Sequence, residues 1–454
     1  MTIDFSKYCL KETCFSTERG LIVDPGLNYF MKNLMTVVLL ESGPRISKNK
    51  WQIAQLNNVF QYARSKSKFW KERLGDIVIE NFEDLSKIPI FTRENLQYQY
   101  QSEGTLAEDE DFFTKVTSGS SGNPVTVSMT SSNSEENFLR QAYASLMKSS
   151  NTSRNGLLLW ASFNIPYPGF SEVLKEDGPN NIHFKNFFKT GERNTIKYAN
   201  PDLTLLIKKI KELKCQVLIC NPYLMESMID LYPAEEMAKD GLETWEFIGG
   251  SPSKYVIDCM NKNNIQISGD YQSEELGLIG YACPHNPFHY HVAATNLFVE
   301  SIDEGITMNG QKMGKLLISS VQNYSTPIIR YENGDIATLL DKCPCGHDGQ
   351  TITNIYGRTK NLIKRKDGSV FPFLIQVKNH PILRKFKEFR FTQTEIDKIK
   401  IEVSGQKNIS SSDINLLSDI VYDQAGKYMK IEIELVDSID WTTKKRIPFK
   451  SLVI

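Results

Sequence analysis

Apolar and polar positions alternate with helical periodicity in the first part of the chain. In residues 51–70, WQIAQLNNVFQYARSKSKFW, apolar side chains recur every three or four positions, the spacing of a helix with one buried face. Asn81 and Thr92 are residue types that cap helix starts, and each stands ahead of a further helical turn. We therefore predict a helical lead-in over about residues 1–110.

At about residue 112 the sequence pattern changes to short β-branched runs separated by Gly, Pro and Asn. Three such runs are NGLLLWASF at 155–163, KCQVLICNP at 214–222 and TWEFIGGSP at 244–252, and a helical stretch occupies 201–214. Strands that alternate with helices of this length are typical of βαβ units. The pattern predicts a partly parallel sheet.

A third pattern begins after Gly357. Two runs that alternate apolar and polar positions, KEFRFTQTEI and KIKIEVSG, precede a helical stretch around 412–424, and MKIEIELVDSI follows it. This order predicts a small α+β domain. The predicted fold class is α/β: a large N-terminal domain, residues 1–357, with mixed and parallel sheets flanked by helices, and a small α+β C-terminal domain, residues 358–454.

Composition and charge exclude several classes of protein. The 454 residues include 53 basic and 54 acidic ones, so we expect no binding to nucleic acid or to an anionic membrane. The sequence nowhere approaches the ~20 consecutive apolar residues of a membrane span, and the charged start MTIDFSKYCLKETCF argues against an export signal. Eight cysteines are too few for a disulfide scaffold at this length. We expect a cytoplasmic enzyme with reduced thiols, some of them available to bind metal.

The stretch Val116–Pro124, VTSGSSGNP, combines glycines with hydroxyl side chains. Glycine lets the backbone turn tightly, and successive N–H groups and hydroxyls can surround an oxyanion. The stretch lacks the Lys-Ser/Thr ending of a Walker loop and does not fit a Rossmann fingerprint. A flexible Gly/Ser linker is the alternative, but the β-like runs on both sides favour a phosphate-binding loop.

In this stretch the sequence resembles the Ser/Thr/Gly-rich phosphate loop of the acyl-adenylate-forming (AMP-binding) superfamily. Four further segments resemble that superfamily's motifs in the same order: FIGGSP at 247–252, DYQSEELG at 270–277, PIIRYENGD at 327–335 and GRTKNLI at 357–363. The CPCG sequence at 343–346 makes the phenylacetate–coenzyme A ligase-like branch, with its deazaflavin-adenylylating relatives, the most similar one. In that superfamily the last segment is the hinge of a mobile C-terminal domain.

The resemblance implies ATP as a cofactor and a set of residues that bind it: Ser118, Gly119, Ser120, Ser121, Gly122, Gly250, Ser251, Pro252, Tyr271, Ser273, Asp335 and Arg358. Within this set the loop would hold the phosphates, Tyr271 would stack on adenine, and Asp335 would hold the ribose. Glu274 would hold Mg²⁺, a hard cation that prefers oxygen ligands. The alternatives are a solvated helix start for Glu274, a turn aspartate for Asp335 and a solvated hinge-loop arginine for Arg358.

The resemblance also implies catalytic roles for Glu274, Arg358 and Lys445. The segment TTKKR at 442–446 resembles the superfamily's catalytic-lysine segment, in which a lysine bridges the carboxylate and the α-phosphate as charge develops. Lys445 has the spacing to the following Pro-Phe that relatives show, whereas Lys444 stands where glycine is usual, so Lys444 is the rival. A cationic tail without a catalytic role is the alternative.

Cysteine and histidine residues gather in two segments. Cys343 and Cys345 offer two thiolates on a tight turn, and Cys283 lies upstream near His289 and His291. One cysteine and one histidine from upstream would complete a closed tetrahedral Zn²⁺ site of the structural type. The resemblance aligns His291 with the ligand histidine of related ligases, with His289 as the rival. Reduced cysteines in a loop, beside exposed histidines, are the alternative.

The predicted function is an AMP-forming acid–thiol ligase. ATP would activate an aromatic or otherwise bulky carboxylic acid as acyl-AMP with pyrophosphate release, and a thiol, coenzyme A first, would take the acyl group. Adenylyl transfer to a hydroxyl and acyl transfer to the thiol of a carrier protein remain alternatives, and so does a homodimer. A non-enzymatic alternative is a zinc-stapled nucleotide-binding module without catalysis, which would be expected to carry damaged motifs.

Overall fold

The structure is a computed structural model that describes residues 15–16, 21–22, 25–107, 111–116, 125–147, 154–161, 169–170, 174–176, 191–199, 202–308, 311–355, 362–368, 370–373, 375, 380–440 and 449–453. The chain divides into two compact units. The first unit comprises Met1–Leu56, Thr130–Leu297 and Asp341–Thr351. The second comprises Asn57–Met129, Phe298–Leu340 and Ile352–Ile454.

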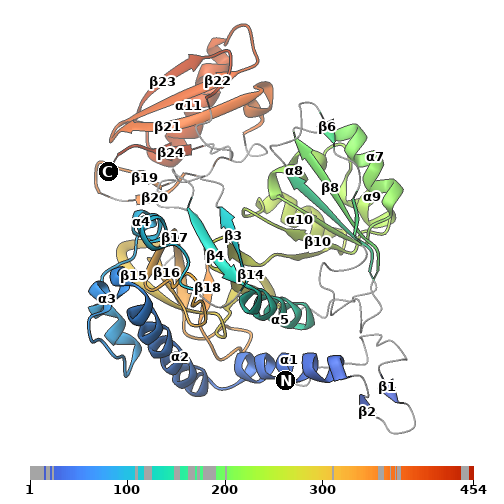
Figure 1. Ribbon diagram of the computed structural model, residues 1–454. Coiled ribbons are helices and arrows are strands. Elements are labelled where there is room, and N and C mark those ends of the chain that lie inside the picture. Colours follow the sequence, from blue (N-terminus) through green and yellow to red (C-terminus); the bar gives the residue numbers. More distant parts are fainter. Residues whose placement is uncertain are drawn as a thin grey trace. The chain divides into compact units, whose positions relative to one another are not determined.

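Helices dominate the first hundred residues (Figure 1). They are α1 (Pro25–Ser42), α2 (Arg45–Lys66), α3 (Lys68–Leu74), the 3₁₀ helix η3 (Phe82–Lys87) and α4 (Arg93–Glu103), after a two-stranded β1–β2 pair (Phe15–Ser16, Leu21–Ile22). Asn81 caps η3 and Thr92 caps α4, each side chain accepting a hydrogen bond from a backbone N–H three residues on. Both caps predicted from the sequence are confirmed.

A mostly parallel sheet with helices forms one part of the first unit. Its strand order is β11-β10-β9-β5-β8-β6, with β7 also paired to β8, and β5, β8, β9, β10 and β11 run parallel. The strands are β5 (Gly156–Ala161), β6 (Gly169–Phe170), β7 (Leu174–Glu176), β8 (Arg193–Ala199), β9 (Val217–Cys220), β10 (Thr244–Phe247) and β11 (Gln266–Ser268). The helices are α7 (Leu203–Leu213), α8 (Pro222–Met228), α9 (Ala234–Lys239) and α10 (Lys254–Lys262). The predicted βαβ pattern is confirmed.

Apolar packing holds these layers together. Leu157, Leu218 and Trp245 of the strands are buried with Ile210 of α7 and Met225 of α8 in one continuous core. The side chains of α7 follow the amphipathic pattern seen in the sequence, because its buried positions recur every three or four residues. The sheet therefore presents the carboxyl ends of its parallel strands along one edge, the place where open α/β sheets bind ligands.

Three antiparallel strands form the other part of the first unit. They are β12 (Tyr271–Ser273), β13 (Gly277–Cys283) and β14 (Asn286–Val292), paired in that order. Helix α5 (Ser131–Met147) packs with α1 against them, and Leu34, Leu139, Tyr143 and Tyr281 meet in a buried cluster.

The second unit contains longer antiparallel strands and a two-stranded pair. Strands β15 (Leu297–Met308), β16 (Gln311–Ser320) and β17 (Tyr331–Leu340) lie side by side in that order. Strand β3 (Phe112–Val116) pairs with β4 (Thr126–Thr130), and the short strands are β18 (Thr351–Thr353), β19 (Leu362–Lys364) and β20 (Val370–Pro372).

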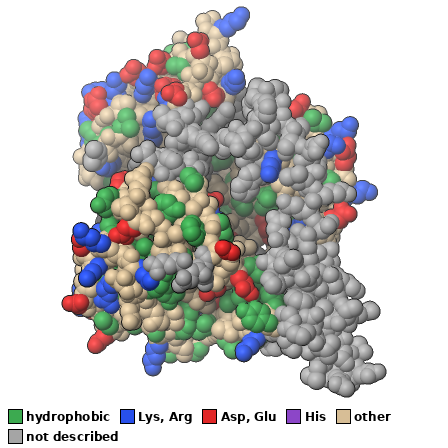
Figure 2. All heavy atoms as spheres, in the orientation of Figure 1, with side chains coloured by type: hydrophobic (Ala, Val, Ile, Leu, Met, Phe, Trp, Pro, Cys, Tyr) green, Lys and Arg blue, Asp and Glu red, His purple; other side chains and the backbone are tan. Residues whose placement is uncertain are grey.

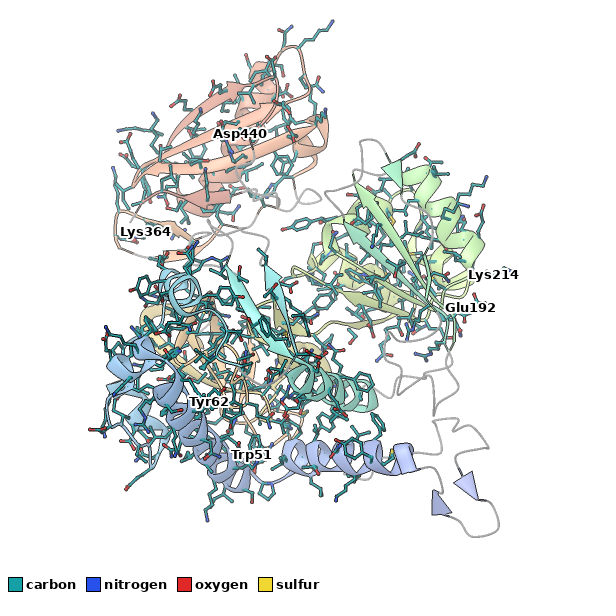
Figure 3. The ribbon with its side chains drawn as sticks, viewed as in Figure 1. Trp51, Tyr62, Glu192, Lys214, Lys364 and Asp440 are labelled. Carbon is teal, nitrogen blue, oxygen red and sulfur yellow. The ribbon has the colours of Figure 1, made fainter. Side chains whose placement is uncertain are left out.

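The end of the chain folds into a small α+β domain with its own core. Strands β21 (Glu388–Glu395), β22 (Lys398–Ser404), β23 (Lys430–Leu435) and β24 (Phe449–Ser451) form a sheet of order β23-β22-β21-β24, covered by α11 (Ser411–Ala425) after the turn η5 (Pro381–Lys385). Phe391, Ile401, Leu417 and Val421 are buried between sheet and helix. Figure 3 draws these side chains, with Lys364 and Asp440 labelled. The sequence predicted this order of strands and helix.

The surface charges of the described residues are mixed in sign. On the face drawn in Figure 2, acidic and basic side chains are interspersed among the described residues, in keeping with the formal net charge of −1. Among the helices that the structure describes, none combines the length and the apolar character that a membrane span needs.

Candidate nucleotide and metal sites

The candidate site residues divide into those that the structure describes and those that it does not. Tyr271, Ser273 and Glu274 lie in the first unit with the segment 250–252, and Asp335 lies in the second. The remaining candidates lie outside the described residues: Ser118, Gly119, Ser120, Ser121, Gly122, Arg358, Lys444 and Lys445. Their roles stay predictions.

The predicted phosphate loop joins two paired strands. Strand β3 ends at Val116 and its partner β4 begins at Thr126. Strand β4 is anchored to residues 325 and 326. The Ser128 N–H donates to Thr326 Oγ1 (2.9 Å), and Ser325 Oγ donates to the Ser128 carbonyl (2.9 Å). The β-like runs that favoured a phosphate loop over a linker are therefore strands.

The segment Gly249–Pro252 follows β10 at the carboxyl edge of the parallel sheet. Gly249 has a φ of 73°, a left-handed conformation that glycine adopts without steric cost. Gly250 and Ser251 are exposed, and Ser253 caps α10 by accepting from the Val256 N–H. The strand therefore ends in exposed backbone beside a helix start, a surface that a flat ring can approach closely.

The next strand, β11, ends beside this segment. A Cβ added to Gly269 would lie 2.7 Å from the Phe247 ring, so only glycine fits between β10 and the turn into β12. Asp270 Oδ1 accepts from the Ala282 N–H (3.1 Å), which fixes the turn, and the Tyr271 ring packs at 5.8 Å from that of Tyr290. The predicted adenine segment and the predicted aromatic motif thus follow adjacent parallel strands.

Glu274 is exposed in the turn between β12 and β13. Ser273 Oγ accepts from the Leu276 N–H (3.2 Å) and closes this turn. The alternative explanation of Glu274 as a helix start is wrong, because the residues on both sides pair as antiparallel strands and no helix begins there. An exposed carboxylate on a hairpin turn can offer oxygen ligands to a cation.

Asp335 stands in a bulge of β17. The pairing with β16 shifts between Lys315–Ile336 and Leu317–Glu332, so residues 333–335 face a single residue of the partner strand. The Asp335 N–H donates to Asn333 Oδ1 (3.1 Å), and Gly334 has a φ of 88°. The carboxylate is half-buried on this bulge.

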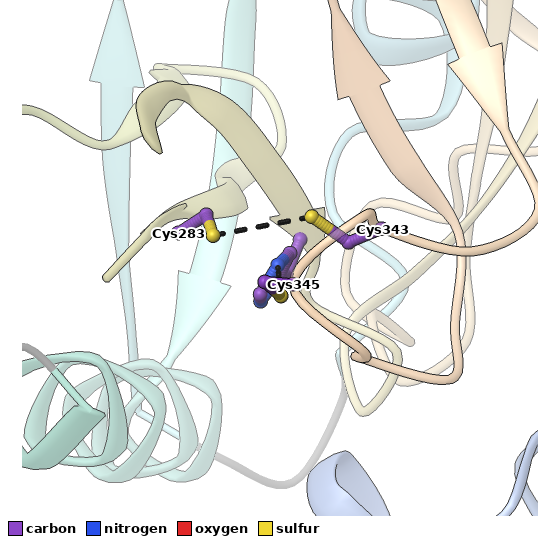
Figure 4. A group of neighbouring side chains, drawn as sticks. Cys283, Cys343 and Cys345 are labelled. Carbon is purple, nitrogen blue, oxygen red and sulfur yellow. Dashed lines mark hydrogen bonds between the residues drawn. The ribbon is translucent and has the colours of Figure 1, made fainter. Parts of the chain in front are cut away.

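Cys283, His291, Cys343 and Cys345 come together, although some sixty residues separate the two segments. Each offers one ligand atom, and these atoms all lie within 4.8 Å of one another. Cys343 Sγ is 3.9 Å from Cys283 Sγ, as Figure 4 shows, and Cys345 Sγ is 3.4 Å from His291 Nε2. The structure thus brings the four predicted ligand residues together, and their role as zinc ligands stays a prediction. The rival His289 directs Nδ1 at Cys343 Sγ from 3.7 Å and is not a member of the group of four.

Local backbone geometry builds the cluster. Cys283 ends β13 and His291 lies on β14, where it pairs with Tyr281. Cys343 and Cys345 lie on a turn that Gly346 closes, since its N–H donates to the Cys343 carbonyl (2.9 Å) and its φ is 97°. A glycine in this left-handed position lets both sulfurs face the same side.

Burial sets the charge of the cluster. It raises the pKa of the Cys283 thiol and raises that of Cys343 to about 12, while burial, followed by the charge of Lys48, lowers the pKa of His291 to about 4. At neutral pH the imidazole is therefore neutral and able to donate a lone pair, and the thiols ionise when a cation takes the place of their protons. Three sulfurs and one imidazole nitrogen match the donor set of structural zinc sites.

A shell of buried polar residues around this cluster was missed by the sequence analysis. It includes Glu41, Lys48 and Arg140, each less than a tenth exposed, and the His347 ring, which stacks on that of His291 at 4.1 Å and 8°. Only His347, adjacent to CPCG, carried a signal in the sequence. The others occupy polar positions of amphipathic helices, where charged residues ordinarily face solvent.

The comparisons with known proteins agree with this architecture. No protein-family model matches the chain. The phenylacetate-coenzyme A ligase of Thermus thermophilus is 22% identical over 359 residues, which are 74% of this chain and 76% of that protein. 2-Hydroxyisobutyryl-CoA ligase, solved in the postadenylation state with 2-HIB-AMP, is similar with a TM-score of 0.63 and 15% identity, covering 92% of this chain and 91% of that one. The acyl acid amido synthetase GH3.15 has a TM-score of 0.53 and 12% identity, covering 88% and 87%.

The fold is that of the acyl-adenylate-forming enzymes, and the predicted α/β class with a small C-terminal domain is confirmed. In sequence the chain is similar to phenylacetate–coenzyme A ligase. The resemblance found in the motifs agrees with this sequence similarity and with the fold.

Proposed function

We propose that the protein activates a carboxylic acid with ATP and transfers the acyl group to coenzyme A. A carboxylate oxygen attacks the α-phosphorus of ATP, which forms acyl-AMP as pyrophosphate leaves. The thiol sulfur then attacks the acyl carbon, a thioester forms, AMP leaves and the thiol proton passes to solvent. The supporting observation is the match over nine-tenths of the chain to the fold of a ligase that holds an acyl adenylate.

The described residues suit the nucleotide end of this reaction. The exposed glycine segment after β10 and the ring of Tyr271 after β11 follow adjacent strands, an arrangement suited to adenine. The half-buried Asp335 carboxylate accepts hydrogen bonds only, which suits two ribose hydroxyls. Ser118, Gly119, Ser120, Ser121 and Gly122 would hold the phosphates, and Arg358 and Lys445 would offset charge that develops on them.

The substrate is proposed to be an aromatic or otherwise bulky acid, on the resemblance to phenylacetate–coenzyme A ligase. The fold is compatible with acceptors other than coenzyme A, since it also occurs in an acyl acid amido synthetase. A hydroxyl that takes the adenylyl group and a carrier-protein thiol that takes the acyl group are the competing acceptors.

Pyrophosphate release from ATP, measured over a panel of carboxylic acids with and without coenzyme A, tests the proposal. We expect release that depends on one class of acid, and a thioester that appears only when coenzyme A is present. Acid-dependent release without a thioester would replace coenzyme A by another acceptor. Protein that binds ATP and releases no pyrophosphate with any acid would overturn the proposal in favour of the non-catalytic module.

Glu274 is proposed to hold Mg²⁺, and the neighbouring Glu275 provides a matched control. E274Q keeps the size of the side chain and removes the charge that a divalent cation needs. We expect E274Q to raise the Mg²⁺ concentration for half-maximal pyrophosphate release by at least tenfold, and E275Q to leave it close to that of the unchanged protein. Equal Mg²⁺ dependence of the two variants would assign the cation to other residues.

We propose in addition that Cys283, His291, Cys343 and Cys345 hold a structural Zn²⁺. The donor set fits this ion: three sulfurs and one nitrogen within 4.8 Å, buried against solvent except at Cys345. Four protein ligands leave no open position, so the ion would tie two segments together and take no part in the reaction. Metal analysis of purified protein should find one zinc per chain, and C345S should lower this content. Protein that is folded and active without bound zinc would contradict the site.

A further inference from the structure

The junction of α1 and α2, residues 41–52, is here named the elbow. Its polar side chains Glu41, Lys48 and Gln52 are 1%, 4% and 3% exposed, although the helices that carry them, α1 and α2, also have many exposed positions. Burial of a carboxylate, an ammonium group and an amide at one helix junction is costly unless each group has a defined partner. The partners lie in the two segments that carry the candidate zinc ligands.

The first contacts are made with the segment that follows His291. The Glu41 carboxylate accepts from the N–H groups of Ala294 (3.2 Å) and Thr295 (2.8 Å) and from Thr295 Oγ1 (2.6 Å). Gln52 Nε2 donates to the carbonyls of Ala294 (3.0 Å) and Leu297 (2.8 Å). The elbow therefore supplies the hydrogen bonds that hold the chain directly after β14.

The second contacts are made with the segment that carries Cys343 and Cys345. The Arg45 N–H donates to Asp348 Oδ2 (3.0 Å), and its guanidinium contacts Asp341 at 2.7 Å. Lys48 Nζ donates to the Glu41 carbonyl (2.8 Å), which leaves two of its three protons for other partners. One short junction thus clamps both ligand-bearing segments.

Lys48 also approaches the cluster itself. A Cβ added to Gly349 would lie 2.7 Å from His347 Nε2 and 3.0 Å from Lys48 Nζ, so a glycine is what allows these two groups to converge. The His347 ring in turn stacks on the His291 ring at 4.1 Å. The ammonium group is therefore separated from a candidate ligand by one imidazole.

Charge balance explains why a cation near the cluster would stabilise a bound metal ion. A Zn²⁺ ion with three thiolates and a neutral imidazole carries a net charge of −1, and a net charge in a buried site is unfavourable without a counter-charge. The other buried cation of this shell, Arg140, is engaged by Glu136 at 3.2 Å and by the Thr295 carbonyl. The Glu41 carboxylate accepts hydrogen bonds from three donors of residues 294 and 295.

We propose that Lys48 is a positioning residue of the zinc centre: it supplies the positive charge that offsets the metal–thiolate group, and the elbow that carries it holds both ligand segments in place. This inference rests on the zinc part of the proposed function. It makes the N-terminal helix junction and the metal centre one coupled element, so that loss of either loosens the other.

Three variants separate charge from packing. K48M removes the ammonium and keeps the length of the side chain, K48R keeps the charge, and K50M changes an exposed lysine two residues away on the same helix. Zinc affinity is measured by transfer of the metal to a chromophoric chelator, and the thiolate-to-metal band is recorded with Co²⁺ in place of zinc. We expect a 10–100-fold loss of zinc affinity in K48M, the range found for partners of metal ligands. K50M should match the unchanged protein, and K48R should lie closer to it than K48M does.

Hydrogen exchange of the unchanged protein with and without zinc provides a second measurement that needs no variant. Amides of the elbow and of residues 293–297 should gain protection with zinc, whereas those of α10 should not change. Two results would overturn the role of Lys48 and leave the zinc site in place. One is equal zinc affinity of K48M and the unchanged protein. The other is hydrogen exchange in the elbow that is the same with and without zinc. Unchanged protein that binds no zinc would overturn the site and this role together, and the pyrophosphate assay would be unaffected.

Discussion

Arg330 shows how one residue fixes the segment that leads to Asp335. It has a φ of 54°, unusual for a residue other than glycine, and lies five residues before Asp335. Its N–H donates to Ser319 Oγ, its carbonyl accepts from the Phe91 N–H, and its guanidinium contacts the Glu300 carboxylate at 3.0 Å. These contacts hold the start of β17 in place from three sides of the residue: its N–H, its carbonyl and its guanidinium group.

Removal of the Arg330 charge tests this anchor. R330M leaves the Glu300 carboxylate without its counter-ion, and the loss is expected to be about 2 kcal/mol, below the usual range for a fully buried pair because Glu300 is partly exposed. The free energy of unfolding in urea measures it. R330M/E300M should recover part of the loss, since no unpaired charge remains. A double variant less stable than R330M would show that the pair itself supplies the stability.

At the scale of the element, helix α11 begins with a reciprocal pair of caps. Ser410 Oγ accepts from the Asp413 N–H, and the Asp413 carboxylate accepts from the Ser410 N–H (3.0 Å) and from Lys385 Nζ (2.5 Å). The hydrogen bond from Lys385, followed by those from Ser410, lowers the pKa of Asp413 to about 2. The charged carboxylate thus stabilises the start of the helix.

The pH dependence of stability follows from the sign of this shift. Because the pKa is lower in the folded than in the unfolded protein, the stabilisation is complete above a pH of about 4 and is lost as the pH falls towards 2. D413N removes the titration and keeps an acceptor for the cap. The difference in urea midpoint between D413N and the unchanged protein should therefore shrink as the pH falls from 6 to 3. D419N, at an exposed position of the same helix, is the control, and parallel profiles for D413N would contradict the assignment.

At the scale of the whole molecule, the proposed reaction has two steps and the chain ends in a domain with its own core. The boundary predicted between residues 357 and 358 lies at the start of the hinge motif, residues 357–363. Lys445 is predicted to reach the phosphates in one of two orientations of the C-terminal domain. Under this hypothesis the lysine serves the adenylation step alone, because it lies near the phosphates in that one orientation only.

K445A should separate the two half-reactions. Acyl-AMP formation is expected to fall 10²–10³-fold, the usual effect of removing one group that offsets transition-state charge, while thioester formation from supplied acyl-AMP stays close to that of the unchanged protein. K444A, one residue away, is the matched control. A loss in K444A with full activity in K445A would move the role to Lys444, and full adenylation rates in both would exclude this segment.

Some features were predictable because they depend on neighbours in sequence. The caps at Asn81 and Thr92 need only a side-chain oxygen and a helical turn that follows, and the βαβ pattern needs only apolar runs of characteristic length. The glycine segment after β10 was likewise visible, since a strand followed by two glycines must turn. These interactions span a few residues.

Two histidines mark the limit of such reasoning. His289 and His291 are two residues apart on β14, so both point to the same face of the strand, and the sequence pattern could not choose between them. The register of β14 against β13 and the position of the CPCG turn placed His291 within the group of four. Glu274 shows the same limit in another way. The alternative that placed it at a helix start was wrong, because β12 and β13 pair on either side of it and form a hairpin.

The sequence by itself determined the order of elements and showed the motifs on which the nucleotide hypothesis rests and the cysteines that could bind metal. Only the tertiary structure decided that Glu41 and Lys48 are buried, because residues that they contact lie some 250 to 300 positions away, and that Arg330 takes a left-handed conformation. Helical periodicity assigns charged residues to solvent by default. Burial of a charge is decided by the groups that fold against it, and those groups come together only when distant segments pack.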